Sequence, residues 1–334
     1  MTKRFNTIVG ETLMTMPLKP INFIINNLLS EGLHILACSP KVGKSWLALW
    51  LSVAIAKGEE VWGNKVKEGT TLYLCFEDSQ IRIQNRLFDI TDEATDKVNF
   101  CTENAMLGGE LEERIINFIK DYPDTVLVII DTLQMIRNTS KDNNYASDYS
   151  DLTILRNLAD KYGIAILLIH HLRKEYDKDP FNRISGTTGI QGAVDSSFIL
   201  IEESRGSKVA TLSCVGRDID YREIKLKRDE DNIWQVVTDS FINRDVLLDD
   251  IVILLSDFMK DKEYHKSTPT ELAEELSKNR DDNISPKSLS KKILQNTMEL
   301  EERSISVVIR KSNGKRLIEI FRNRDIRDDK MATP

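Results

Sequence analysis

The chain has few cysteines and histidines, and neither type shows the spacing of a metal site. Its four cysteines, Cys38, Cys75, Cys101 and Cys214, form no C-x-x-C pair. Its four histidines show no zinc-ligand pattern either. These absences argue against a disulfide-stapled secreted domain and against a zinc site. They predict a reduced, cytoplasmic location.

Long apolar runs are also missing. No run approaches the ~18 residues that a membrane span needs, and the N-terminus lacks the apolar core of a signal peptide. We therefore expect no membrane partner. The 334 residues are 41% hydrophobic and 30% charged, as in soluble globular proteins, and they suffice for one large domain or two ordinary ones.

The most informative segment is residues 38–45, Cys-Ser-Pro-Lys-Val-Gly-Lys-Ser. It matches G-x-x-x-x-G-K-[ST] with Cys38 in place of the first glycine, and it lies between a strand-like and a helix-like run. That context predicts a loop whose backbone N–H groups bind phosphates. Lys44 would neutralise phosphate charge, and Ser45 would offer a hydroxyl to Mg²⁺. The predicted ATP-binding residues are Ser39, Pro40, Lys41, Val42, Gly43, Lys44, Ser45 and Trp46.

Three further polar sites follow apolar, strand-like runs. Asp131 fits a Walker B aspartate, which holds Mg²⁺ through water. Glu77, followed by Asp78, stands where a carboxylate can orient an attacking water, on a strand that we expect beside the phosphate-loop strand. His170 and His171 end another strand, where a polar side chain can contact the γ-phosphate. Helix capping, helix-terminal charge and simple packing are the respective structural alternatives.

Strand-like and helix-like segments alternate along the first 200 residues. Residues 126–130 and 164–169 are almost wholly apolar, as expected when both faces of a sheet are covered, and residues 148–162 show helical spacing. The alternation predicts an α/β fold with a mainly parallel sheet flanked by helices. From residue 197 onward the pattern predicts antiparallel strands that extend the sheet. Residues 21–29 are predicted to form a short helix.

A smaller unit is predicted beyond a boundary near residues 239–245. Residues 246–258 show helical periodicity, and two further helices are predicted to begin at Pro269 and Pro286. Two strands around Asn313-Gly314 follow, and Asn-Gly is a strong hairpin signal. Three helices and a hairpin are the winged-helix layout, with the third helix as recognition helix. A protein-docking unit is the alternative.

Charge is unevenly distributed along the chain. The net charge is −7, but the segment from Ser285 to the end carries 12 Lys and Arg against 7 Asp and Glu, a net +5, which leaves −12 for the rest. A basic tail on an acidic body is typical of a tail that contacts nucleic acid. A solvated charged surface is the alternative.

Taken in order, these motifs resemble the RepA-type plasmid and phage replication ATPases, relatives of the DnaB-type hexameric helicases. The resemblance is carried by residues 17–32, 39–45, 74–78, 129–133, 169–174, 185–189 and 216–218. It covers roughly residues 17–240 and, less specifically, the winged-helix tail. It implies a homo-oligomeric ring of RecA-like P-loop subunits with ATP and Mg²⁺ at the subunit interfaces.

The resemblance also implies roles for single residues. Glu77 would be the water-activating glutamate, Asp131 the Walker B acid and His171 the strand-tip sensor of the γ-phosphate. Arg217 is similar to the arginine finger that reaches a neighbour's nucleotide, with Arg205 and Arg222 as competing candidates.

In such a ring, two polar segments would face the central channel, residues 138–150 and 173–189. The second carries four cations that could follow a phosphate backbone. It also carries three acids, so we expect modest affinity for DNA. The cations are Arg173, Lys174, Lys178 and Arg183.

The leading hypothesis is a hexameric DNA-replication helicase that translocates on single-stranded DNA, with a replication initiator or primase as a further partner. The alternative is a DNA-bound ATPase switch, a loader or initiation factor that does not unwind DNA. A DNA-binding regulator with a degenerate nucleotide site is a third class, against which the intact motif residues argue. The predicted domains are a lead-in (1–20), a RecA-like ATPase domain (21–240), a winged-helix-like domain (245–325) and a tail (326–334).

Overall fold

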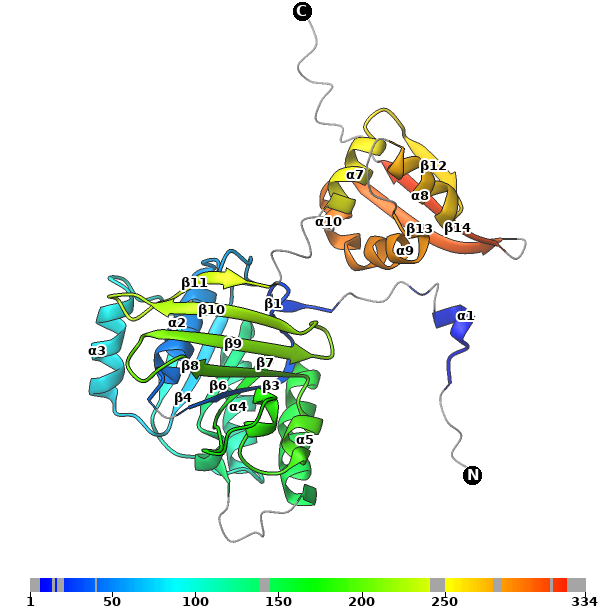
Figure 1. Ribbon diagram of the computed structural model, residues 1–334. Coiled ribbons are helices and arrows are strands. Elements are labelled where there is room, and N and C mark those ends of the chain that lie inside the picture. Colours follow the sequence, from blue (N-terminus) through cyan, green and yellow to red (C-terminus); the bar gives the residue numbers. More distant parts are fainter. Residues whose placement is uncertain are drawn as a thin grey trace, which may run out of the picture. The chain divides into compact units, whose positions relative to one another are not determined.

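The computed structural model describes residues 7–13, 16, 21–39, 41–137, 145–240, 250–278, 284–312 and 315–322. The chain divides into two compact units (Figure 1). One, the core unit, is Asn22–Phe241, and the other comprises Ile242–Pro334, with which Met1–Ile21 is grouped. Within these described ranges, no helix has the length and apolar character that a bilayer crossing requires.

A nine-stranded sheet organises the core unit, in the order β11-β10-β9-β8-β3-β7-β6-β4-β5. The strands from β8 to β5 in this order run parallel, and β9, β10 and β11 continue the sheet antiparallel. The predicted α/β fold with a mainly parallel sheet is confirmed, although β8 is parallel to β3 where the sequence predicted an antiparallel strand. The bounds are β3 Gly32–Cys38, β4 Thr70–Cys75, β5 Val98–Cys101, β6 Thr125–Asp131, β7 Ala165–His171, β8 Ser196–Glu202, β9 Val209–Gly216, β10 Arg222–Arg228 and β11 Trp234–Asp239.

Helices cover both faces of the sheet, and alternate residues of each strand therefore enter different cores. In β3, Leu36 packs in the core that contains Leu47 and Leu51 of α2, whereas Ile35 packs in the core that contains Leu155 of α5. The helices are α2 Lys44–Lys57, α3 Gln80–Ile90, α4 Glu110–Asp121, α5 Tyr145–Tyr162 and α6 Thr188–Ala193, with the 3-10 helices η1 Leu133–Ile136 and η2 Pro180–Arg183.

The helix predicted for residues 21–29 is wrong. This segment is a hairpin of β1 (Phe23–Ile25) and β2 (Leu29–Ser30), which pair antiparallel. Asn27 takes a left-handed conformation with φ 56° at the turn, and the Lys67 N–H donates to the Ile24 carbonyl. Backbone pairing with a distant segment therefore overrides the local apolar pattern.

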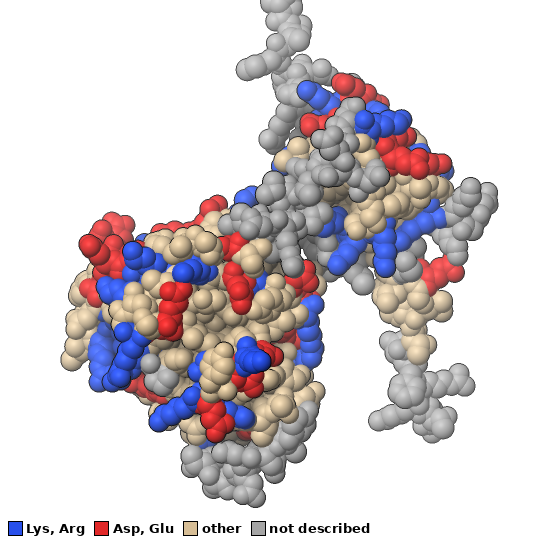
Figure 2. Space-filling model, in the orientation of Figure 1, with Lys and Arg blue, Asp and Glu red and all other residues tan. Residues whose placement is uncertain are grey.

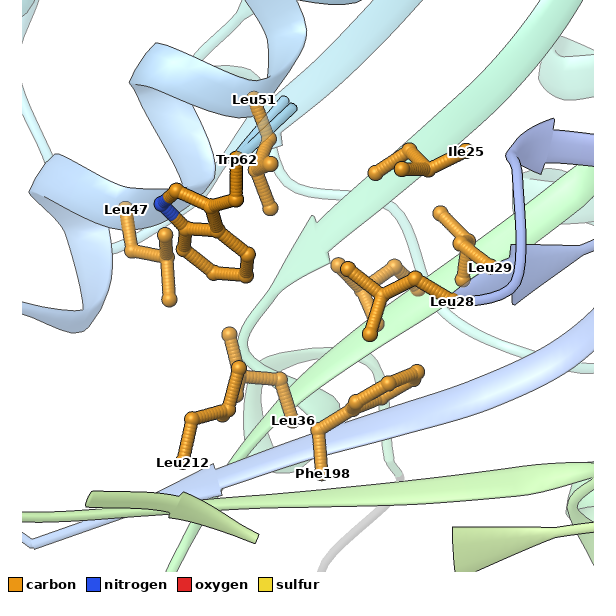
Figure 3. A pocket seen from close by; sticks show the side chains of 10 residues that line it. Ile25, Leu28, Leu29, Leu36, Leu47, Leu51, Trp62, Phe198 and Leu212 are labelled. Carbon is orange, nitrogen blue, oxygen red and sulfur yellow. The ribbon is translucent and has the colours of Figure 1, made fainter. Parts of the chain in front are cut away.

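A small apolar cavity of about 30 Å³ lies between this hairpin, α2 and the sheet (Figure 3). Leu47 and Leu51 of α2, Leu28 of the hairpin, Trp62 and Phe198 point toward it. Because its lining is apolar, it lacks the polar partners that a bound water needs. It is a packing defect beneath α2 and is separate from the polar site described below.

From residue 250 onward, the described part of the second unit contains four helices and a three-stranded antiparallel sheet in the order β12-β14-β13. Thr268 caps α8 and exchanges hydrogen bonds with Glu271, as the capping-box pattern implies. Asn313 and Gly314, the predicted hairpin turn, lie outside the described residues, as do residues 246–249 of the first predicted helix. The elements are α1 Gly10–Leu13, α7 Asp250–Phe258, β12 Tyr264–Ser267, α8 Pro269–Ser277, α9 Pro286–Gln295, α10 Thr297–Glu302, β13 Ile305–Ser312 and β14 Lys315–Arg322.

Candidate functional site

The predicted phosphate loop joins the carboxyl end of β3 to the first residue of α2. Gly43 precedes the helix with φ 98°, a conformation that favours glycine. A Cβ at this position would stand 2.9 Å from Nη1 of Arg228, so a larger residue would also displace this guanidinium. Pro40, one of the predicted loop residues, lies outside the described residues. The backbone N–H groups that begin α2 are thus available to an anion at this edge of the sheet.

Lys44 lies between two carboxylates. Its Nζ is 3.5 Å from Oδ1 of Asp131 and 3.6 Å from Oε2 of Glu77, and its side chain is 13% exposed. Neither Nζ nor Oδ1 of Asp131 has a hydrogen-bond partner. A buried ammonium and a buried carboxylate oxygen without hydrogen bonds are costly unless a ligand satisfies them. The arrangement therefore fits a phosphate group together with a cation.

Asp131 is oriented by two hydroxyl groups. Its Oδ2 accepts hydrogen bonds from Oγ of Ser45, at 3.1 Å, and from the hydroxyl of Tyr73, at 2.9 Å. Burial and the charge of Asp131 raise the pKa of Tyr73 well above its usual value, so this hydroxyl stays protonated and can donate. The predicted Mg²⁺ residues Ser45 and Asp131 are thus in contact. Tyr73 was missed because a buried tyrosine in an apolar strand gives no sequence signal.

Mg²⁺ in such sites takes one or two protein ligands and completes its shell with phosphate and water. Among the described residues, no group of three or more His, Cys, Asp or Glu side chains is placed to hold a metal ion. Ser45 and Asp131, which are in contact, could supply one or two ligands to such an ion.

Glu77 reaches the same site from β4. The expectation that β4 lies beside the phosphate-loop strand is wrong, because β7 and β6 stand between β3 and β4. Glu77 still approaches Lys44, since it follows the carboxyl end of β4 and the lysine side chain is long. The Thr132 hydroxyl donates to Oε1 of Glu77 at 2.9 Å and fixes this carboxylate.

The two histidines at the end of β7 differ in environment. His171 is 40% exposed, and its Nε2 lies 3.9 Å from Oε1 of Glu77. Burial and the nearby Lys44 charge lower its pKa, which favours the neutral imidazole. His170 is buried, and its Nε2 donates to the Ser185 carbonyl at 2.8 Å. Only His171 therefore faces the site.

Trp46 and Asp78 share one partner on α3. The Arg86 guanidinium lies 5.6 Å from the centre of the Trp46 ring and forms an ion pair with Asp78. A cation over an indole face is a favourable contact. These interactions anchor the start of α3 beside the phosphate loop, next to Glu77.

Arg228 is a second residue that sequence reasoning missed. It ends β10, whose carboxyl end lies at the same edge of the sheet as the phosphate loop, and its guanidinium is beside Gly43. The guanidinium lies 5.7 Å from the ring centre of Trp234. The available sequence signal was a run of basic residues at the end of a strand. Whether that strand end lies beside the phosphate loop depends on the order of the strands in the sheet.

Arg217 lies at the opposite edge of the sheet. It follows β9, which runs antiparallel to β8, and its Nη1 is 3.2 Å from Oδ1 of Asp195. Asp195 also accepts from Nη2 of Arg156 at 2.8 Å and from the Leu33 N–H at 3.0 Å. The seven residues of β3 separate this edge from the loop by about 20 Å at roughly 3.3 Å per residue.

The structure thus brings Lys44, Ser45, Glu77, Asp131 and His171 together and leaves Arg217 apart. The competing arginines differ from it. Arg222 is buried in an ion pair with Asp239, and Arg205 is exposed in the turn between β8 and β9.

The two predicted DNA-facing segments are described in part. Residues 138–144 lie outside the described residues. In the segment 173–189, Arg173, Lys174 and Lys178 are exposed and Arg183 is half-buried, with acids among them. Figure 2 shows basic and acidic side chains interspersed over the visible face of the core unit.

Comparison with known proteins identifies the family and the fold. Residues 3–177, just over half of the chain, match the family described as AAA domain. A solved structure of a DnaB-like replicative helicase, reported with its primase interactions, is similar with a TM-score of 0.51 at 14% identity. The similarity covers 61% of this chain and 57% of that one, and it shows the fold.

Two curated sequences are also similar. Histidinol-phosphate aminotransferases of Bacillus subtilis strain 168 and of Bacillus subtilis subsp. natto are each 26% identical over 176 residues, covering 45% of this chain and 49% of each enzyme. The chain spans about half the length of the curated relatives it matches. The match that covers half of the chain decides the family. The chain belongs to the AAA domain family.

Proposed function

We propose that this protein is an ATP-hydrolysing DNA-replication protein of the RepA type, a hexameric helicase that translocates on single-stranded DNA. The observation that carries the proposal is the division of charged groups between two edges of one sheet. Lys44 stands between Glu77 and Asp131 at one edge, and Arg217 stands at the other. The DnaB-like fold supports it.

At the loop edge, each side chain has a chemical task. Bound ATP with Mg²⁺ supplies the phosphoryl group and the charge that hydrolysis requires. Lys44 binds the phosphates, and Ser45 with Asp131 holds the cation. Oε1 of Glu77, oriented by the Thr132 hydroxyl, orients the attacking water and accepts its proton. His171 donates a hydrogen bond to the terminal phosphate.

Arg217 acts on the nucleotide of a neighbouring copy. It lies about 20 Å from the loop of its own chain, given the length of β3, so it cannot reach its own nucleotide. Two copies that place one edge against the other make a head-to-tail contact. Repetition of such a contact closes a ring when the rotation permits it.

A DNA-bound ATPase switch, such as a loader or initiation factor, is the second candidate. The observation that favours it is the mixture of acids and bases in residues 173–189, because translocation requires repeated backbone binding. In either case, a replication initiator or primase is the proposed protein partner.

The decisive experiment combines ATP, Mg²⁺ and a forked DNA duplex with the purified protein. Strand separation that requires ATP hydrolysis, by a species whose mass in light scattering corresponds to six chains, supports the helicase. The Lys44→Ala variant is the control for contaminating activity. ATP hydrolysis without strand separation favours the switch, and absence of ATP hydrolysis contradicts both.

We further propose that the second unit is a winged-helix-like domain that binds duplex DNA through α9. Lys287 and Lys291 are exposed on this helix. Figure 2 shows basic side chains gathered over α9 and the β13–β14 hairpin on the visible face. Phosphate contacts release counterions, so affinity should fall with salt with a log–log slope of about −0.9 per contact.

The test is a salt titration of the full chain with labelled duplex DNA. Lys287→Ala/Lys291→Ala should weaken DNA binding. It should also make the slope of log affinity against log salt shallower by the contribution of two phosphate contacts, about 0.9 each. Lys260→Ala/Lys278→Ala is the matched control, since both lysines are exposed elsewhere on the same unit. Equal slopes for the two double variants would instead indicate that α9 does not contact DNA.

A further inference from the structure

One buried carboxylate, from the described part of the segment 138–150, contacts the segment 173–189, and the resemblance implies that both segments face DNA. Asp148 lies in the first turn of α5 and is 2% exposed. Its Oδ2 accepts from the backbone N–H of Thr187, at 3.0 Å, and from the Thr187 hydroxyl, at 2.7 Å. Its Oδ1 lies 2.9 Å from Nη1 of Arg137. A charged group from one segment thus holds a residue of the other.

Two partners of Asp148, Arg137 and Thr187, lie near residues of the candidate site. Arg137 follows η1, which begins directly after Asp131 and Thr132. On the other side, the Ser185 N–H donates to the His171 carbonyl at 3.1 Å, and His170 donates to the Ser185 carbonyl. Contacts therefore continue from His171, which lies beside Glu77, through residues 185–187 to Asp148.

The contacts of Asp148 are strong and directional. A carboxylate that accepts from an arginine and from two further donors forms charge-assisted hydrogen bonds. Removing the charge leaves Arg137, whose side chain is 10% exposed, with a much weaker partner. Asp151 lies on the same helix and is 3.8 Å from Nε of the same arginine, but it is 20% exposed. Substitution of Asp151 removes the same charge from a longer and more exposed contact with Arg137, and it therefore serves as a comparison for substitution of Asp148.

We propose that Asp148 is a positioning residue that couples ATP hydrolysis to DNA binding, by fixing residues 185–187 and Arg137 relative to each other. The inference rests on the proposed function, since it requires that DNA contact these segments. Asp148 is too buried to contact DNA itself. Its effect must therefore appear in the coupling between two sites, which is a measurable free energy and acts equally in both directions.

The test compares ATP hydrolysis by full-length variants with and without single-stranded oligothymidylate. Without DNA, Asp148→Asn should hydrolyse ATP at a rate within about twofold of wild type. The stimulation, which is the ratio of the rates with and without the oligonucleotide, should be at least about fivefold smaller than in wild type. A loss of this size lies within the usual range of coupling factors. Asp151→Asn should keep the stimulation. ATP should also have a smaller effect on the affinity for the oligonucleotide in Asp148→Asn than in wild type, and oligonucleotide a correspondingly smaller effect on the affinity for ATP.

A second pair of variants guards against misfolding of Asp148→Asn. Thr187→Val removes the hydroxyl donor and should reduce the stimulation, whereas Thr187→Ser restores the donor and should recover it. Wild-type stimulation in Asp148→Asn or in Thr187→Val would overturn the coupling role. A parallel loss of basal and stimulated rates would do the same, because it indicates a structural role. If the wild-type protein hydrolyses ATP without any response to DNA, the proposed function itself fails.

Discussion

The two edges of the core sheet carry opposite arrangements of charge. At the loop edge, one lysine lies between two carboxylates, Glu77 and Asp131. At the other edge, one carboxylate, Asp195, holds two arginines, Arg156 and Arg217. The first edge leaves a buried ammonium and a carboxylate oxygen without hydrogen bonds, whereas the second leaves a half-exposed guanidinium. The loop edge therefore provides an ammonium and a carboxylate without hydrogen bonds, and the other edge provides a half-exposed guanidinium.

The largest effect should come from Arg217→Ala. If its guanidinium stabilises charge on a neighbour's nucleotide, removal should slow ATP hydrolysis by about 10³-fold or more. Mixing Arg217→Ala with Lys44→Ala should restore part of the activity, because a mixed interface can contain one intact loop and one intact arginine. Hydrolysis rates across mixing ratios, with subunit exchange verified, provide the measurement.

The matched control is Arg205→Ala, an exposed arginine in the turn between β8 and β9. It should hydrolyse ATP at the wild-type rate. If Arg205→Ala is impaired and Arg217→Ala is not, the edge comparison is wrong and the arginine acts from the loop edge. Full activity in a strictly monomeric preparation would also count against Arg217.

The next effect should come from Glu77→Gln, which keeps the shape of the side chain but removes its basicity. Hydrolysis should fall by about 10²-fold or more, while ATP affinity measured by calorimetry stays near wild type. Lys44→Ala should lose both binding and hydrolysis, because it removes the cation that faces the phosphates. A Glu77→Gln variant with wild-type turnover would exclude the proposed role in orienting water.

A third effect concerns pH, since each edge contains a buried histidine. Burial lowers the pKa of His34, near Asp195, and that of His170, behind the loop edge, to about 4. The unfolded chain binds these protons below about pH 6.5, and the folded chain binds them only near pH 4. The free energy of unfolding should therefore fall as pH decreases through this window.

From pH 7 to pH 5, each histidine should lower the free energy of unfolding by about 2 kcal/mol, at 1.36 kcal/mol per pKa unit. Urea unfolding of wild type, His34→Gln and His170→Gln at the two pH values measures it. Each variant should show a smaller decrease than wild type. Equal decreases in all three proteins would mean that groups other than His34 and His170 cause the pH dependence of the free energy of unfolding.

The smallest effect should come from Tyr73→Phe. Loss of the hydroxyl that orients Asp131 should weaken Mg²⁺-dependent ATP binding about tenfold, as removal of groups behind metal ligands does elsewhere. The measurement is the Mg²⁺ concentration for half-maximal hydrolysis. Tyr221→Phe is the control, since that hydroxyl contacts the exposed Glu223. An unchanged Mg²⁺ requirement would mean that Ser45 alone orients Asp131.

Local sequence signals were enough to find one half of the site. Asp131 and His171 each end an apolar strand, and Lys44 and Ser45 follow the loop after another. Parallel strands bring such ends to one edge. The same patterns predicted the α/β class and the mainly parallel sheet. The roles of these residues, and the binding of ATP, Mg²⁺ and DNA, stay predictions.

The other half depends on distant pairings. Tyr73 and Arg228 reach the site only because of the strand order, which placed β4 three strands from β3 rather than beside it. Asp195 and Asp148 are single acids in unremarkable segments, and their partners lie 39 residues away in each case. The hairpin at residues 23–30 was missed because the pairing of residues 65–67 with it is not visible in either segment alone.

The shared carboxylate of Asp195 has a consequence for how subunits join and separate. If Arg217 turns toward a neighbour's nucleotide, as we propose, Asp195 keeps Arg156 and the Leu33 N–H as partners. The buried carboxylate of Asp195 is therefore not left unpaired when Arg217 departs. An unpaired buried charge would make this departure unfavourable by about 3–5 kcal/mol. With Arg156 still paired to Asp195, release of Arg217 would cost less than breaking an isolated buried pair. The proposed contact between subunits would then be reversible, and the same arginine could engage and release at every turnover.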